Sequence, residues 1–77
     1  MNFYEEEVDY ILELNNKLLR AAGVNETYFG INFLGDSYEV AVVQDNGKLR
    51  TWFHEWDEAF KYVKNIHRDA NWEEAGW

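Results

Sequence analysis

The sequence predicts an α+β fold with the element order α-β-β-β-α, in which a three-stranded antiparallel meander carries two helices on one face. Apolar residues recur at helical spacing near both ends of the chain, and they alternate with polar residues between positions 27 and 54. Two turn signals, Gly35-Asp36 and Asn46-Gly47, divide the alternating region into three strands. The 77 residues contain no linker, repeat or low-complexity stretch, so we expect a single domain over 1–77.

The first predicted helix covers residues 3–22, and it has more apolar surface than one sheet contact requires. Its apolar face is widened on one side to an arc of roughly 200°. Asn15 falls in the centre of this face, where we expect it to satisfy a buried backbone group; a register-setting role across an interface is the alternative. Gly23 is placed to adopt the left-handed conformation that ends many helices. The face consists of Tyr4, Val8, Ile11, Leu12, Leu18, Leu19 and Ala22, and it is widened by Phe3, Tyr10 and Leu14.

Strands are predicted at 27–34, 37–44 and 48–54, and the two-residue loops between them set the pairing. The first loop pairs Phe33 with Tyr38, and the second pairs Val40 with Phe53. Both loops place the same central-strand residues on one face, and this agreement favours a meander with that face buried. The predicted buried face contains Phe29, Ile31, Phe33, Tyr38, Val40, Val42, Leu49 and Phe53.

The opposite face of the sheet is predicted to consist of three cross-strand rows. Trp52 lies beside Gly30 and Ala41, so its ring can lean across the two smallest residues of that face. Glu39 faces His54, and the two form an opposite-charge pair when the histidine is protonated. The rows are Tyr28–Val43–Arg50, Gly30–Ala41–Trp52 and Asn32–Glu39–His54.

The second predicted helix covers 56–70, and an acidic, aromatic tail at 71–77 follows it. His67 lies at the edge of the core-facing side of this helix, where we expect a semi-buried residue with a hydrogen-bond partner. We expect Trp72 to fold onto the core beside the first helix. For Trp77 the core and a short docking peptide remain open alternatives. The core-facing side consists of Trp56, Ala59, Phe60, Val63, Ile66, His67 and Ala70.

Composition limits the class of protein. Fifteen acidic against seven basic residues give a formal charge of −8, which opposes direct binding to nucleic acid or an anionic membrane and favours a basic partner. No window holds the ~18 consecutive apolar residues of a membrane span, and the acidic N-terminus is unlike a signal peptide. The lack of cysteine fits a reducing compartment, so we expect a cytoplasmic protein.

No pattern in the sequence predicts a reaction. It has no Gly-rich phosphate loop and neither the H-E-x-x-H nor the G-x-S-x-G motif. His54 and His67 have no further ligands or nucleophile at a defined spacing. We therefore expect no enzyme activity, no cofactor and no metal site.

The acidic residues are the main candidates for partner binding. The helix dipole favours acids at helix starts, but it does not account for those on strands, turns and tail. Carboxylates spaced like phosphates can occupy the Lys/Arg groove of a nucleic-acid-binding protein, and aromatic side chains can supply the anchors. The candidates are Glu5, Glu6, Asp9 and Glu13 on the outer face of the first helix, Asp36, Glu39 and Asp45 near the turns, and Tyr28 and Trp52 on the reverse sheet face.

Small size, acidity and a compact α+β core together resemble the inhibitors that bacteriophages and mobile elements encode against host nucleases, including anti-CRISPR and DNA-mimic proteins. The resemblance covers the whole chain and rests on no motif. It implies occlusion of a basic nucleic-acid-binding surface in the cytoplasm of a bacterial host. The alternative is a small homo-oligomeric or adaptor module of bacterial or phage origin, which would use the sheet face or the wide apolar arc of the first helix.

The element order is also that of the double-stranded-RNA-binding domain. In that family the second helix begins with lysines that contact phosphates. Here the second helix begins with Asp57 and Glu58, which would repel phosphates. The resemblance is therefore limited to element order, and RNA binding is not implied.

Overall fold

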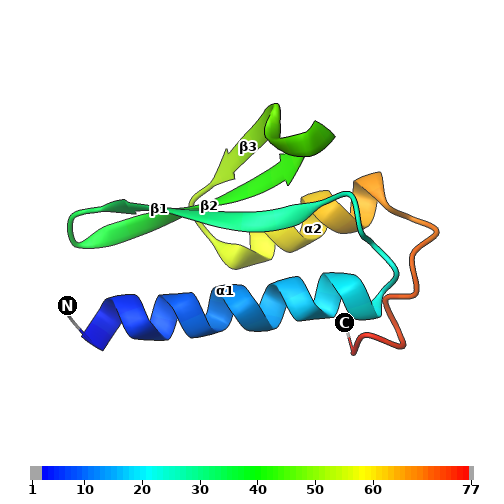
Figure 1. The fold of residues 1–77 in the computed structure, drawn as a ribbon, viewed down its shortest axis with the longest axis horizontal. Helices are drawn as coiled ribbons and strands as arrows, with labels where there is room; N and C mark the ends of the chain where they lie inside the picture. Colours follow the sequence, from blue (N-terminus) through cyan, green and yellow to red (C-terminus); the bar gives the residue numbers. More distant parts are fainter. Residues whose placement is uncertain (1–2, 77) are drawn as a thin grey trace.

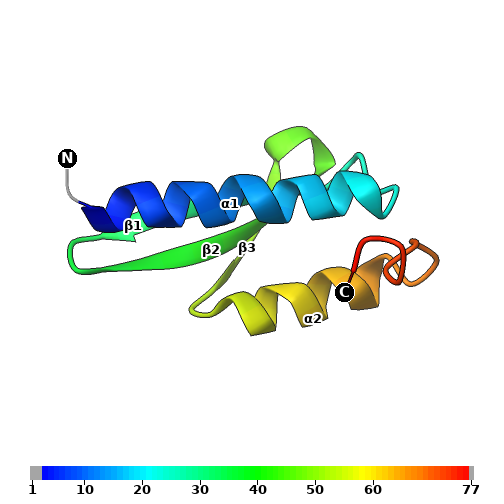
Figure 2. The same ribbon diagram turned by 90° about the horizontal axis from the view of Figure 1, so that it is seen from below.

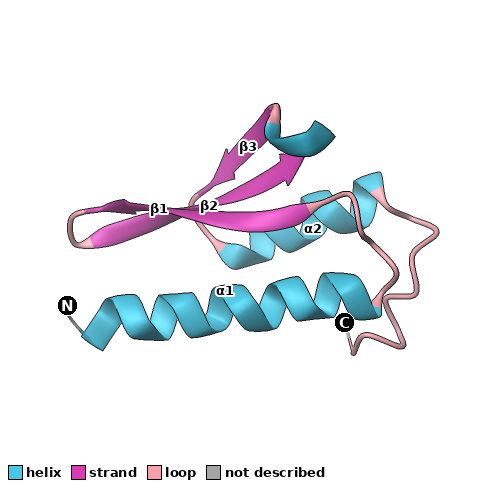
Figure 3. Cartoon of the chain, in the orientation of Figure 1, coloured by secondary structure: helices cyan, strands magenta, loops and turns pink. Residues whose placement is uncertain are grey.

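The computed structural model describes residues 3–76 and has the predicted element order (Figure 1). The strands form one antiparallel sheet in the order β1-β2-β3. Both helices cover the same face of this sheet, and the other face is left open (Figures 1 and 3). The predicted fold class is confirmed. The elements are α1 (Phe3–Ala21), β1 (Tyr28–Leu34), β2 (Ser37–Gln44), the short 3-10 helix η1 (Asp45–Gly47), β3 (Leu49–Phe53) and α2 (Trp56–Ile66).

The two hairpin turns have the predicted registers. Phe33 pairs with Tyr38, and Val40 pairs with Phe53. At the second turn, Asn46 has a φ of 55° and Gly47 a φ of 89°, as a type I′ turn requires. The Lys48 N–H closes this turn on the Asp45 carbonyl at 3.1 Å. The turn and its register are therefore encoded locally, and β3 is only one residue shorter at each end than predicted.

The core lies between the sheet and the helices, with α1 packed on β1 and α2 packed on β2 and β3. Phe29 occupies its centre, where its ring meets those of Trp56 and Phe60 edge-on, at centroid distances of 5.3 and 5.6 Å. Phe33 and Leu49 were predicted to be buried, but they are 38% and 49% exposed because they lie at strand ends that the helices do not cover. The main buried residues are Leu19, Ala22, Val24, Phe29, Val40, Val42, Ala59 and Val63.

α1 ends one residue earlier than predicted, in a motif that uses Gly23. This glycine has a φ of 88°, and its N–H bonds the Arg20 carbonyl at 3.0 Å. The next residue, Val24, bonds the Leu19 carbonyl at 2.9 Å, which completes a Schellman motif. Because Val24 and Leu19 are both buried, this cap also directs the chain back over the core toward β1.

α2 ends at Ile66, four residues before the predicted end. His67 leaves the helical conformation, with φ −124° and ψ 58°, and its side chain bonds Thr27. The following turns hold the tail against the end of α1, where the Asn71 N–H bonds the Ala22 carbonyl at 2.9 Å. Trp72 packs against the core as predicted. Trp77 and the side chains of Phe3 and Tyr4 lie outside the described part.

The two helices lie side by side on the sheet but do not pack closely against each other (Figure 2). Within residues 3–76, no Cα atom of α1 lies within 8 Å of a Cα atom of α2. A hollow of about 260 Å³ lies between them, lined by Asn15 and Leu18 of α1 and by Phe60 and Lys64 of α2. Each helix is therefore held mainly by the sheet.

Candidate protein-binding surface

Charged residues are unevenly distributed along the molecule. The N-terminal half of α1 through Glu13 and the β1–β2 turn with the start of β2 lie toward one end of the molecule, and α2 begins on the side nearer to that end and runs away from it (Figure 1). These segments, with the start of β2 through Glu39 and the start of α2 from Glu55 to Glu58, carry ten of the fifteen acidic residues and none of the seven Lys and Arg residues. The other half has five acidic and seven basic residues, so the formal charges are −10 and +2, which together give −8. We call the first region the acidic half; its carboxylates are Glu5, Glu6, Glu7, Asp9, Glu13, Asp36, Glu39, Glu55, Asp57 and Glu58.

Four of the predicted site residues follow one side of α1. Glu6, Asp9 and Glu13 are exposed, and Glu5 is half-buried. Because residues three and four apart are neighbours on a helix, Glu6, Asp9 and Glu13 form one continuous row. The row lies on the side of α1 away from Leu18, which faces α2. Glu5 and Glu6 belong to the first turn, where the helix dipole favours negative charge, so the helix tolerates this concentration of carboxylates.

The two turn carboxylates of the predicted site lie at opposite ends of β2. Asp36 is exposed in the β1–β2 turn and belongs to the acidic half. Asp45 begins η1 at the far end of the eight-residue strand, which is about 25 Å away at the rise of a β-strand. The fold therefore brings Asp36, but not Asp45, to the same end as the α1 carboxylates.

Glu39 lies on the open face of the sheet, and the prediction of its partner is wrong. Its Oε1 atom accepts a hydrogen bond from Asn32 Nδ2 at 3.3 Å. The β2–β3 ladder ends at Val40 and Phe53, so His54 lies outside the strand and does not pair with Glu39. Among the described residues, Glu39 is the one carboxylate on this face, and it is held by a neutral amide.

The open face of the sheet presents two half-exposed aromatic side chains. Tyr28 is 41% exposed and Trp52 is 43% exposed. The residues between them on β2, Ala41 and Val43, are buried although no helix covers this face. The Tyr28 hydroxyl lies 3.8 Å from the point that a Cβ on Gly47 would occupy, so the ring reaches across the sheet toward η1. The aromatic pair thus covers β2 and forms a surface separate from the α1 carboxylates.

The buried polar contact predicted for Asn15 is instead made by its neighbour, Asn16. Asn16 Oδ1 accepts from the Phe29 N–H at 2.7 Å, and Asn16 Nδ2 donates to the Phe29 carbonyl at 3.2 Å. Asn16 therefore occupies backbone groups of β1, which is an edge strand and would otherwise present them to another chain. Asn15 is 7% exposed and lines the hollow between the helices. Helical periodicity does not specify which strand the helix covers, so it could not identify Asn16 as the residue that meets β1.

A hydroxyl, an imidazole and a carboxylate meet where α2 ends beside the start of β1. His67 Nε2 lies 2.7 Å from Thr27 Oγ1, and His67 Nδ1 lies 3.4 Å from Glu26 Oε1. The same order of groups activates nucleophiles in acyl-transfer enzymes. Thr27, however, has no exposed surface, so a substrate carbonyl cannot reach its hydroxyl. The cluster joins two segments of the fold and does not form a catalytic site.

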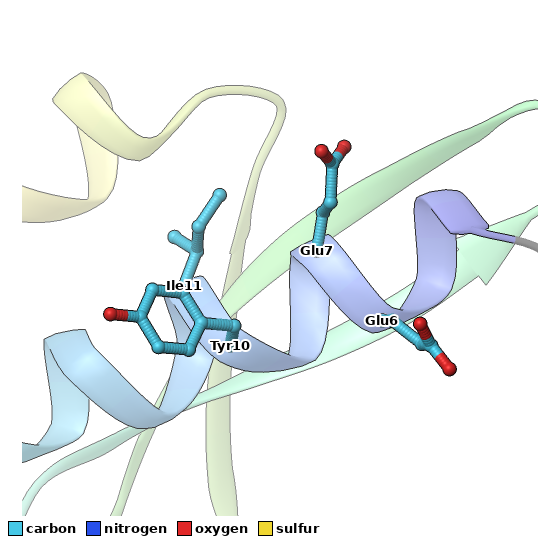
Figure 4. A pocket seen from close by; sticks show the side chains of 4 residues that line it. All are labelled: Glu6, Glu7, Tyr10 and Ile11. Atoms are coloured by element: carbon cyan, nitrogen blue, oxygen red, sulfur yellow. The ribbon is translucent and has the colours of Figure 1, made fainter.

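α1 also has an apolar surface that faces solvent. Tyr10 is 66% exposed, Ile11 37% and Leu14 46%. Tyr10 and Ile11 line a shallow hollow of about 450 Å³ together with Glu6 and Glu7 (Figure 4). The wide apolar arc predicted for this helix therefore divides into a side buried on the sheet and a side that the described residues leave uncovered. Carboxylates border the uncovered side.

Neither a recognised site nor a relative assigns a function to the chain. Among residues 3–76, no three His, Asp or Glu side chains are grouped as metal ligands, and neither helix is long and apolar enough to cross a membrane. No family model matches the chain, and comparisons with curated proteins and with solved structures found no match. The charges and the exposed side chains of the surface are therefore the features that bear on function.

Proposed function

We propose that this protein is a non-enzymatic inhibitor that binds the nucleic-acid-binding surface of a host nuclease or another DNA- or RNA-binding protein. The observation that carries the proposal is the segregation of charge, with −10 in the acidic half and no Lys or Arg there. A uniformly acidic surface of this kind complements the Lys/Arg groove in which such proteins hold phosphates. It is the mechanism of the anti-CRISPR and DNA-mimic inhibitors that the chain resembles in size, charge and architecture.

The packing of α1 on the sheet supports this mechanism. The row of Glu6, Asp9 and Glu13 spans about 10 Å at the rise of an α-helix. A helix held on a sheet keeps these carboxylates in place before binding, so little conformational entropy is lost when a basic groove closes on them. Asp36 extends the acidic surface to the β1–β2 turn at the same end of the molecule.

Binding of this kind needs no bond to be made or broken. The field of the acidic half attracts the basic surface of the partner and speeds association. Once bound, the protein excludes nucleic acid by occupying the same cationic groups. Because the attraction is electrostatic, affinity is expected to fall steeply as ionic strength rises.

The proposal is tested by identifying a partner and then measuring competition. The tagged protein is used to capture binders from bacterial cytoplasm, and the purified binder is mixed with a fluorescent oligonucleotide that it holds. We expect the protein to displace the oligonucleotide, with a tenfold or larger loss of affinity when salt is raised from about 50 to 200 mM. A binder whose oligonucleotide stays bound at saturating protein would contradict the proposal.

A further inference from the structure

The solvent-facing side of α1 has the spacing of a coiled-coil seam. Glu7, Tyr10, Leu14 and Lys17 follow one another at intervals of three, four and three residues, and all four are exposed. These positions lie away from the buried stripe that includes Val8, which is 2% exposed on the core side. The helix therefore has a second stripe, which no other described element covers.

The spacing of the residues in this stripe is symmetric about its centre. Tyr10 and Leu14 are equally far from residue 12 along the helix, and so are Glu7 and Lys17. If a second α1 lies antiparallel against the first, Glu7 faces Lys17 of the other helix, and Tyr10 faces Leu14. Each contact then occurs twice across a twofold axis near residue 12. A parallel arrangement would instead place Glu7 on Glu7 and Lys17 on Lys17, with like charges in contact.

We propose that a second copy of this chain docks on this stripe, with the two α1 helices antiparallel. The pairing buries Tyr10 and Leu14 and places opposite charges at both ends of the seam. It also lays the acidic half of each chain beside the other half of its neighbour, which reduces the repulsion between two acidic chains. Ile11, 37% exposed, borders the seam close to the axis and adds apolar contact.

The association is expected to be weak and to depend on concentration. α1 has 19 residues, which corresponds to about 28 Å of helix. A single pair of helices of this length buries less surface area than the interfaces of stable complexes, which bury about 1,200 Å² or more. Asp9 stays outside the seam, but Glu6 lines the same hollow as Tyr10, so the dimer covers part of the acidic row and competes with the binding function proposed above.

The test is sedimentation equilibrium between about 10 µM and 1 mM. The wild-type mass should rise from 9.2 kDa toward twice that value. Glu7→Lys and Lys17→Glu should each weaken the dimer by about tenfold or more, because each places like charges in both end contacts. An equimolar mixture of the two variants should restore wild-type affinity to within about threefold, because positions 7 and 17 then carry opposite charges at both ends.

Two further variants make the result specific. Leu14→Glu should abolish the dimer, and its circular dichroism should match the wild type because Leu14 is exposed. Trp52→Ala, on the open sheet face, should leave the dimer unchanged. A wild-type mass of 9.2 kDa at every concentration would overturn the proposal. Dimer affinity that is unchanged in Glu7→Lys or Lys17→Glu would also overturn it, and so would a mixture that dimerises no more tightly than either variant alone. Loss of the dimer in Trp52→Ala would place the second copy on the sheet face and would overturn the proposal as well.

Discussion

The two sides of α1 contain the same classes of residue in different environments. Leu19 has no exposed surface, whereas Leu14, five residues earlier, is 46% exposed. Likewise Asn16 bonds the backbone of β1, whereas Asn15 lines a hollow. Helical spacing determines which residues lie together, but the neighbouring element determines which group becomes core. One side of α1 thus contributes to folding, and the other is available for binding.

The largest expected difference between the two sides is in leucine truncation. Leu19→Ala leaves a cavity in a closed core and should lower the free energy of unfolding by about 3 kcal/mol. Leu14→Ala should change it by less than about 0.5 kcal/mol, because the side chain is half-exposed. Urea denaturation of both variants at one dilute concentration measures the difference. Equal losses would show that Leu14 is buried in the native protein.

The asparagine pair should show a smaller contrast. Asn16→Leu removes both hydrogen bonds to Phe29 and leaves its N–H and carbonyl without that partner, so we expect a loss of about 2 kcal/mol. Asn15→Leu should stay within about 1 kcal/mol of the wild type, because Asn15 makes no side-chain hydrogen bond to the described residues. The same denaturation assay compares them. If Asn15→Leu lowered the free energy of unfolding more than Asn16→Leu, this would show that Asn15, the residue predicted from the sequence, makes the backbone contact.

The smallest expected effect concerns the contact between His67 and Thr27. Thr27→Val keeps the shape of the side chain and removes the hydroxyl that lies 2.7 Å from His67 Nε2. We expect a loss of about 1 kcal/mol, the net value of one hydrogen bond. Thr51→Val is the matched control, because its hydroxyl makes only a 3.5 Å contact with Tyr62. If Thr51→Val were the more damaging change, the cluster at His67 would not help to hold the fold.

Local signals in the sequence predicted most of the fold. Asn46 and Gly47 encode a turn that pairs β2 with β3, and Gly35 closes the other hairpin with a φ of 71°. The end of α2 was mispredicted because His67 leaves the helix to reach Thr27, forty residues earlier in the chain. Periodicity within one helix contains no information about a contact of that range.

The candidate surface could be predicted less completely, since it depends on how elements meet. The carboxylates of α1 were recognised as one row, and Asp36 joins them because the hairpin tip and the start of α1 lie at the same end. Asp45 was grouped with them by its place in a turn, although β2 separates the two turns. The acidic half has no Lys or Arg, but this is apparent only once the starts of α1, β2 and α2 are located in the fold.

We propose that the acidic half, and not net charge alone, binds the partner. The most direct test of this proposal compares two triple reversals to lysine with the same change in net charge: Glu6, Asp9 and Glu13 in the acidic half, and Asp69, Glu73 and Glu74 in the other. Circular dichroism checks that both variants fold. We expect the first to bind a captured basic partner about 100-fold more weakly, about 2.7 kcal/mol, and the second to stay within about threefold of the wild type. Equal losses in the two variants would show that net charge, and not the acidic half, determines binding.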